Sequence, residues 1–188
     1  MKSSAGEGTP SEAAAKSAFR VCAIVPSYRH VARLGDVVAA LTALDLPVLI
    51  IDDGNAEEAR STIGALADPA RHVTVIRRAE NGGKGAAIKT GFRAAIAAGY
   101  THALQVDADG QHDLADAPAF LAKARAAPGA VVSGAPLYDA SVPKSRKFGR
   151  YITHVCVWIE TMSLEITDSM CGFRLYPLAV VQRVLDRE

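Results

Sequence analysis

The 188-residue chain has no long apolar run, almost no net charge and only three cysteines. A membrane-spanning helix needs about 18 or more consecutive apolar residues. The sequence has no such run, so we expect no spanning segment. The formal net charge of +1 gives no excess of positive charge that would attract nucleic acid, so we expect no nucleic-acid partner. The length and the 49% hydrophobic content predict one globular domain with an extensive core.

The cysteines, Cys22, Cys156 and Cys171, are far apart and form no Cys-x-x-Cys pair. This pattern disfavours a disulfide framework or a zinc site and favours reduced thiols in the cytoplasm. The first 18 residues are rich in Ser, Gly, Ala and Glu and lack the apolar core of a signal peptide. We expect residues 1–18 to be a disordered lead-in and residues 19–188 to form the domain.

Short β-branched runs alternate with alanine-rich amphipathic stretches from Phe19 onward. Strands are expected at residues 21–25, 48–51, 73–76, 102–106 and 130–133. Helices are expected at residues 31–44, 56–66, 86–98 and 115–126. This alternation predicts right-handed crossovers, a mostly parallel central sheet and a three-layer, Rossmann-like α/β fold. In such folds the ligand lies beyond the carboxyl ends of the strands.

Polar or glycine-rich segments follow four of the expected strands. They are Pro26-Ser-Tyr-Arg-His30, Asp52-Asp-Gly-Asn55, Asn81-Gly-Gly-Lys-Gly85 and Asp107-Ala-Asp109. Each segment alone is compatible with ordinary turn chemistry. Because all four would meet at one edge of one sheet, together they predict a single pocket.

Asp107 and Asp109 are two residues apart where the fourth apolar run ends. Residues i and i+2 of an extended chain project to the same side, so both carboxylates could converge on one hard cation. A cation held by two or three protein oxygens keeps open positions, which a diphosphate would fill. Two alternatives are a solvated loop or helix cap, and the nucleophile motif of haloacid-dehalogenase-type phosphatases, which this pair also resembles.

The segment Asn81-Gly-Gly-Lys-Gly85 is neither a P-loop nor a dinucleotide fingerprint. Arg78 stands where a P-loop needs its first Gly, and Gly85 stands where it needs Ser or Thr. Ile88 occupies the third small position of a dinucleotide fingerprint. Two interpretations remain: a helix N-terminus that faces an anion with Lys84 beside it, or a flexible solvated loop.

Taken together, these segments resemble the family-2 glycosyltransferases with the GT-A fold, most closely the polyprenyl-phosphate (dolichol-phosphate) mannose or glucose synthase branch. The resemblance covers residues 21–177. It rests on Ile24-Val-Pro-Ser-Tyr28, Ile50-Ile-Asp-Asp-Gly54, Asn81-Gly-Gly-Lys-Gly-Ala-Ala-Ile88 with Gly91, Val106-Asp-Ala-Asp-Gly-Gln111, and Asp168-Ser-Met-Cys-Gly-Phe-Arg174. It implies a metal-dependent, inverting transferase that moves a sugar from a UDP- or GDP-linked donor to a polyprenyl phosphate or a hydroxyl-bearing acceptor.

The resemblance also implies roles for single residues. The nucleotide pocket would be formed by Pro26 and Tyr28, by Asp52 and Asp53 at the nucleoside end, and by Asn81, Lys84 and Gly85 at its border. Asp107 would lie near the donor sugar and the diphosphate, within the metal site. Asp109 and Gln111 would hold Mg²⁺ or Mn²⁺, which neutralises charge growing on the leaving nucleoside diphosphate. Gln111 also disfavours the phosphatase, whose motif carries a Thr-type residue there.

By the same resemblance, Asp168 is the active-site carboxylate. A hydroxyl acceptor would need Asp168 as general base. A phosphate acceptor would not, because a phosphate monoester has a second pKa of about 6 and is already largely a dianion at neutral pH. Asp168 would then orient groups. A turn or helix-capping aspartate is the alternative interpretation.

The stretch at residues 144–164 joins a basic cluster to an apolar face. One interpretation is a core-packed helix with a solvated basic start. In the other, Arg146 or Arg150 contacts the acceptor or donor phosphate near a membrane surface. The second interpretation would place the protein peripherally at the inner face of the membrane.

Three features depart from the family pattern. Arg29 and His30 stand where relatives usually carry Asn-Glu, and Ala135-Pro136 stands where the lipid-phosphate branch usually carries Ser-Arg. The chain also ends at Glu188, soon after the last motif. Two alternatives to a complete transferase therefore stay open: a catalytic-domain fragment, and a domain that binds the nucleotide sugar without transfer.

Overall fold

The computed structural model describes residues 19–134 and 171–187, which form a layered α/β unit around one sheet. The described strands are β1 (Val21–Ser27), β2 (Val48–Asp52), β3 (Val73–Arg77), β4 (His102–Gln105), β5 (Val132–Ser133) and β6 (Arg174–Pro177). Their spatial order is β3-β2-β1-β4-β6-β5. The first four strands are parallel, whereas β6 runs antiparallel to both β4 and β5.

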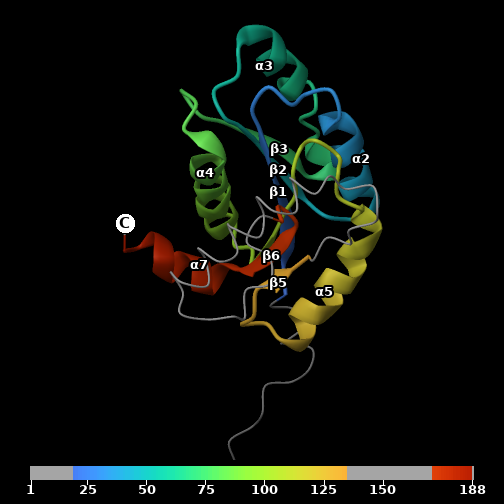
Figure 1. Cartoon of the computed structure of the whole chain (residues 1–188), viewed down its shortest axis with the longest axis vertical. Helices are drawn as coiled ribbons and strands as arrows, with labels where there is room; N and C mark the ends of the chain where they lie inside the picture. The colour runs from blue at the N-terminus through green and yellow to red at the C-terminus, as the bar shows by residue number, and fades with distance from the viewer. Residues whose placement is uncertain (1–18, 135–170, 188) are drawn as a thin grey trace, which may run out of the picture.

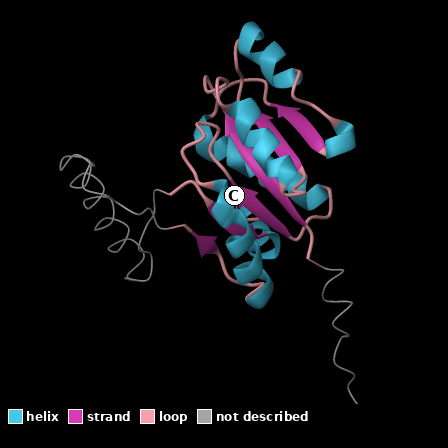
Figure 2. Cartoon of the chain, turned by 90° about the vertical axis from the view of Figure 1, so that its right-hand side faces the viewer, coloured by secondary structure: helices cyan, strands magenta, loops and turns pink. Residues whose placement is uncertain are grey.

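Helices cover both faces of the sheet, with α4 and α7 on one side and α2 and α5 on the other (Figure 1). The described helices are α2 (Leu34–Ala43), α3 (Glu57–Gly64), α4 (Gly83–Ala97), α5 (Ala117–Ala126) and α7 (Leu178–Leu185), with 3₁₀ turns η1 (Pro69–Arg71) and η2 (Leu114–Asp116). Figure 2 shows the strands side by side with helices packed over them. The expected three-layer α/β fold is therefore confirmed.

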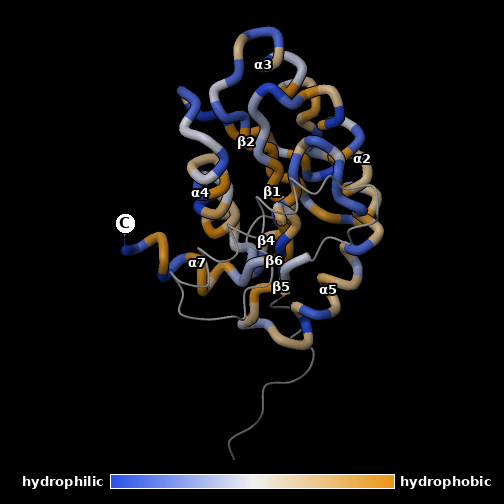
Figure 3. The backbone as a smooth tube through the Cα atoms, viewed as in Figure 1, coloured by the Kyte–Doolittle hydropathy of each residue, from blue (hydrophilic) through white to orange (hydrophobic). Residues whose placement is uncertain are grey.

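The alternation of side chains along β1 divides the core between the two faces. Ala23 and Val25 pack with α2 and α5, whereas Cys22 and Ile24 pack with α4. Successive residues of a strand point to opposite faces, so a strand covered on both sides is apolar throughout. Figure 3 shows this hydrophobic colour along the central strands, between the helices. The buried sheet is the rigid support for the loops at its carboxyl edge.

The observed elements differ from the expected ones mainly at the carboxyl end of the chain. Helix α4 begins at Gly83, earlier than the expected residue 86, and β5 is limited to Val132–Ser133. Neither β6 nor α7 was predicted, because β6 exists only through its pairing with β4 and β5. The stretches at residues 1–18 and 144–164 lie outside the described residues.

Two further findings concern the cysteines and the membrane. Cys22 and Cys171 are free thiols, and burial of Cys22 on β1 raises its pKa to about 12. Within residues 19–134 and 171–187, no helix is long and apolar enough to cross a bilayer.

Candidate active site

The carboxyl ends of β1, β2 and β4 and the start of α4 border one cavity of about 360 Å³. Seven predicted site residues line it: Pro26, Tyr28, Asp53, Asn81, Lys84, Asp107 and Asp109. The other lining residues, which sequence reasoning did not assign, are Ser27, His30, Gly83, Ala87 and Ala108. All four polar strand ends thus meet in one pocket, as expected for parallel strands that end at the same edge.

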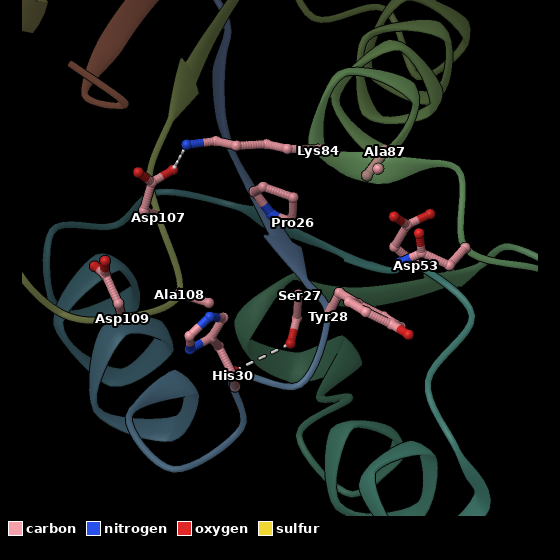
Figure 4. Close-up of a pocket in the computed structure, with 12 residues that line it drawn as sticks. Pro26, Ser27, Tyr28, His30, Asp53, Lys84, Ala87, Asp107, Ala108 and Asp109 are labelled. Carbon is pink, nitrogen blue, oxygen red and sulfur yellow. Dashed lines mark hydrogen bonds and ion pairs between the residues drawn. The ribbon is translucent and has the colours of Figure 1, made fainter. Parts of the chain in front are cut away.

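The cavity has two chemically distinct ends (Figure 4). Tyr28 and Asp53 lie together at one end, whereas Asp107 and Asp109 lie at the other. An aromatic ring and a single carboxylate are groups that a nucleoside can contact. The second end, with two carboxylates and an ammonium group, is suited to charged phosphate and metal chemistry.

Asp52 faces away from the cavity and holds the turn after β2. Its carboxylate is fully buried, and it accepts hydrogen bonds from Asn55 N at 3.0 Å, Asn55 Nδ2 at 2.8 Å and Arg77 Nε at 2.9 Å. Burial raises the pKa of Asp52, but the hydrogen bonds from Asn55 and the Arg77 guanidinium outweigh burial and hold the pKa below its usual value. Asp52 is therefore not among the residues that line the cavity, and its expected contact with a nucleoside stays a prediction.

The side chain of Asn55, which contacts Asp52, also makes hydrogen bonds to the loop after β1. Asn55 Nδ2 also donates to the Ser27 carbonyl at 2.8 Å, and Asn55 Oδ1 accepts from Arg29 N at 2.8 Å. Arg29 has φ 60, a left-handed conformation that is costly for a residue other than glycine. Its guanidinium lies 5.0 Å from the centre of the Tyr28 ring. These contacts set Tyr28 at the mouth of the cavity.

Asp53 links β2 to the start of α4. It is 2% exposed, forms an ion pair with Arg78, and accepts from Gly82 N at 3.2 Å. Next to it, Gly54 has φ +71 and lies against the backbone of residues 80–81, where a Cβ would overlap. The glycine-rich segment is therefore packed onto the end of β2, which favours the ordered helix N-terminus over the flexible loop.

Asp107 is held by cationic or polar groups from two other segments. Its Oδ1 lies 2.6 Å from Lys84 Nζ on α4, and its Oδ2 lies 3.4 Å from His112 Nε2. Burial raises the pKa of Asp107, but hydrogen bonds from His112 and Lys84 and their charges outweigh it, so the pKa is lowered overall. Asp107 is consequently a carboxylate at neutral pH.

Residues 171–173, the Cys-Gly-Phe part of the last motif, also help to position Asp107. Gly172 is buried against the Asp107 carboxylate, and a Cβ at this position would overlap it. Phe173 stacks on the His112 ring with centroids 5.4 Å apart, and it packs on Phe120 at 4.5 Å. His112 was missed by sequence reasoning, although it follows directly on the Asp107-to-Gln111 motif.

The carboxylates at the second end, those of Asp107 and Asp109, supply the oxygen ligands that a hard divalent cation prefers. Asp109 lines the cavity, and its Oδ1 accepts from Gln111 N at 3.0 Å, while Gln111 itself is exposed and does not line the cavity. The described part of the chain holds no group of three or more His, Cys, Asp or Glu residues placed for a metal. Asp107 and Asp109 would thus supply two protein ligands and leave further positions to phosphate oxygens.

One further predicted residue, on α4, is described but is not part of the cavity wall, and two others lie outside the described residues. Gly85 lies on α4 between the lining residues Lys84 and Ala87 but does not itself line the cavity. Asp168 and Arg150 lie outside the described residues, so their expected roles stay predictions.

The parallel strands, the acidic residues at the ends of β2 and β4 and the cavity beside them define a Rossmann-like α/β protein. The family model for glycosyl transferase family 2 matches residues 22–178, so the chain belongs to this family. Open α/β sheets bind their ligands outside the carboxyl ends of the parallel strands, which is where this cavity lies.

Named relatives fall in the polyprenyl-phosphate branch that the sequence resembles. The chain is 28% identical over 180 residues to polyprenol monophosphomannose synthase of Mycolicibacterium smegmatis, covering 88% of this chain and 64% of the relative. It is 28% identical over 166 residues to undecaprenyl-phosphate mannosyltransferase of Micrococcus luteus, covering 84% and 66%. The chain therefore spans slightly less than two thirds of these relatives.

A solved structure shows the same GT-A fold. It is glucosyl-3-phosphoglycerate synthase from Mycobacterium tuberculosis in complex with Mn²⁺ and uridine-diphosphate-glucose. The TM-score is 0.62 at 16% sequence identity, covering 89% of this chain and 59% of the other. At this identity the likeness establishes the fold alone.

Proposed function

We propose that this protein is a metal-dependent, inverting glycosyltransferase that moves a sugar from a UDP- or GDP-linked donor to a polyprenyl phosphate. The observation that carries the proposal is the pair Asp107 and Asp109, which share one cavity with Lys84 and Asp53. The two ends of that cavity correspond in chemical character to the two ends of a nucleoside diphosphate.

The donor would lie along the cavity from Tyr28 to Asp109. Tyr28 offers a ring face to the base, and Asp53 offers a carboxylate to its N–H groups. Lys84 and the first backbone N–H groups of α4 would attract the diphosphate, because a helix N-terminus carries partial positive charge. Mg²⁺ or Mn²⁺ held by Asp107 and Asp109 would neutralise charge on the departing nucleoside diphosphate.

The acceptor assignment rests on the relatives, whose names specify polyprenol or undecaprenyl phosphate as the acceptor. A lipid phosphate is already ionised at neutral pH, so Asp168 would orient it, and Arg150 would contact a phosphate. A hydroxyl-bearing acceptor is the second candidate, because Ala135-Pro136 replaces the expected Ser-Arg. With a lipid acceptor the protein would work in the cytoplasm, at the inner face of the membrane.

The test is sugar transfer with UDP- and GDP-linked donors, with Mn²⁺ or EDTA, to a short polyprenyl phosphate and to a free sugar. The proposal expects Mn²⁺-dependent transfer to the lipid phosphate. Activity on the free sugar alone would replace the acceptor assignment with the second candidate. Donor binding without any transfer or hydrolysis would indicate a non-catalytic binding domain. Metal-dependent hydrolysis of simple phosphomonoesters without use of a nucleotide sugar would point to the phosphatase.

A further inference from the structure

Lys84 and Asp107 form an ion pair inside the part of the cavity assigned to the metal. Lys84 is the second residue of α4, Asp107 follows β4, and the two side chains point toward one another (Figure 4). The Nζ to Oδ1 distance is 2.6 Å. An ammonium group therefore already neutralises this carboxylate in the absence of a divalent cation.

The neighbouring acidic residue, Asp109, differs from Asp107 in its contacts. Asp109 accepts a backbone hydrogen bond from Gln111, and no cationic side chain pairs with it among the described residues. A divalent cation entering alone would find one available carboxylate and one already neutralised by Lys84. No third acidic, histidine or cysteine ligand joins them in the described part of the chain. Such a donor set binds a hard cation weakly.

Lys84 differs in its freedom to move from Arg78, the cation that pairs with Asp53. The side chain of Lys84 is 52% exposed, whereas that of Arg78, paired with the nearly buried Asp53, is 22% exposed. An ammonium on a flexible four-carbon stem can change partner without loss of packing, unlike a guanidinium enclosed beside a buried carboxylate. Lys84 also lines the cavity in which a diphosphate would add further negative charge.

We propose that Lys84 and the divalent cation compete for Asp107, and that the donor diphosphate relieves this competition by taking Lys84 as its own counter-ion. The inference rests on the proposed function and adds to it the coupling between metal and nucleotide. The two bind with positive cooperativity, and by linkage each strengthens the other by the same factor. Lys84 thus keeps metal affinity low until a donor arrives.

The test measures Mn²⁺ binding without nucleotide, by electron paramagnetic resonance, in the wild type, Lys84→Met, Asp107→Asn and the double variant. We expect Lys84→Met to tighten Mn²⁺ binding about tenfold, within the usual range of coupling between sites. Because the effect acts through Asp107, Lys84→Met should not increase the Mn²⁺ affinity when Asp107→Asn is also present. Lys123→Met, on α5 outside the cavity, removes the same charge and should change nothing.

The same titrations with UDP and with GDP complete the design. Nucleotide should tighten Mn²⁺ binding in the wild type and do so less in Lys84→Met. Lys84→Met could leave the Mn²⁺ affinity unchanged while the wild type still binds Mn²⁺ in a nucleotide-dependent way. That result would overturn the proposed competition but not the metal-dependent function. If Lys84→Met raises the Mn²⁺ affinity equally with and without Asp107→Asn, the proposed competition is also wrong. That result would reflect the removal of a positive charge and not a contact with Asp107. Absence of wild-type Mn²⁺ binding even with nucleotide overturns the metal-dependent function as well.

Discussion

Gly172 packs directly on the carboxylate of Asp107, although 65 positions separate them in the sequence, and a side chain at position 172 would overlap that carboxylate. The contact joins two of the family motifs at one point of the cavity. It explains why a glycine stands before Phe173: the backbone must approach the acidic group closely.

Gly172→Ala should therefore displace Asp107. We expect a loss of stability of roughly 1–3 kcal/mol from overpacking. Mn²⁺-dependent nucleotide binding should weaken about tenfold if the displacement costs about 1.4 kcal/mol of binding free energy. Calorimetry with UDP and GDP measures the binding. Gly129→Ala, at a position with open space around it, is the matched control. Equal affinity in the two variants would show that the contact is unimportant for binding.

Asp109→Ala should remove the metal dependence of nucleotide binding, because Asp109 is the cavity carboxylate that pairs with no cationic side chain among residues 19–134 and 171–187. Wild-type affinity for UDP or GDP should be higher in Mn²⁺ than in EDTA, and the variant should show one affinity in both. The control is Asp116→Ala, an exposed aspartate whose side chain makes no capping hydrogen bond to α5. Wild-type binding that is equal in Mn²⁺ and EDTA would refute the metal site.

Asp53→Ala should affect stability as well as nucleotide binding. Although Asp53 lines the cavity, its carboxylate is buried and paired with Arg78. Its loss leaves the guanidinium without its partner, at a cost of about 1–3 kcal/mol. Chemical denaturation and calorimetry measure the two effects. Combining Asp53→Ala with Arg78→Ala should recover part of the stability but none of the binding. Unchanged stability in Asp53→Ala would contradict this assignment.

His102, at the start of β4, should make the stability depend on pH. Its Nε2 lies 3.1 Å from the Pro128 carbonyl and its Nδ1 lies 2.9 Å from Thr101 Oγ1. Burial lowers the pKa of His102 more than the Pro128 carbonyl raises it. Since the folded protein prefers the neutral ring, its contribution is complete above the ordinary pKa of 6.5 and is lost as the pH falls below that value.

His102→Gln supplies the comparison for this pH effect, because its amide can donate to the Pro128 carbonyl but does not titrate. Denaturant titrations between pH 7.5 and 5 should show a steeper loss of stability in the wild type than in the variant, a range set by the ordinary histidine pKa of about 6.5. Parallel curves would assign the acid sensitivity to other groups.

The order of strands and helices up to residue 133 follows from local patterns. Runs such as residues 48–51 of β2 are apolar on both sides, and amphipathic stretches such as Gly83–Ala97 carry one buried stripe. The polar strand ends, Asp107 and Asp109 above all, could be located because parallel strands end at a common edge. β6 could not be predicted, since four residues ending in Pro177 form a strand only where β4 and β5 supply hydrogen-bond partners.

Only the tertiary structure decided what each charged side chain of the site does. Asp52 and Asp53 are neighbours at a strand end and project to opposite sides, so one holds a turn while the other reaches the cavity. The pairing of Lys84 with Asp107 depends on how α4 crosses the sheet. Local sequence determines which elements form, because propensity and periodicity act over a few residues. Long-range packing decides which charges meet, because those distances are set by the whole fold.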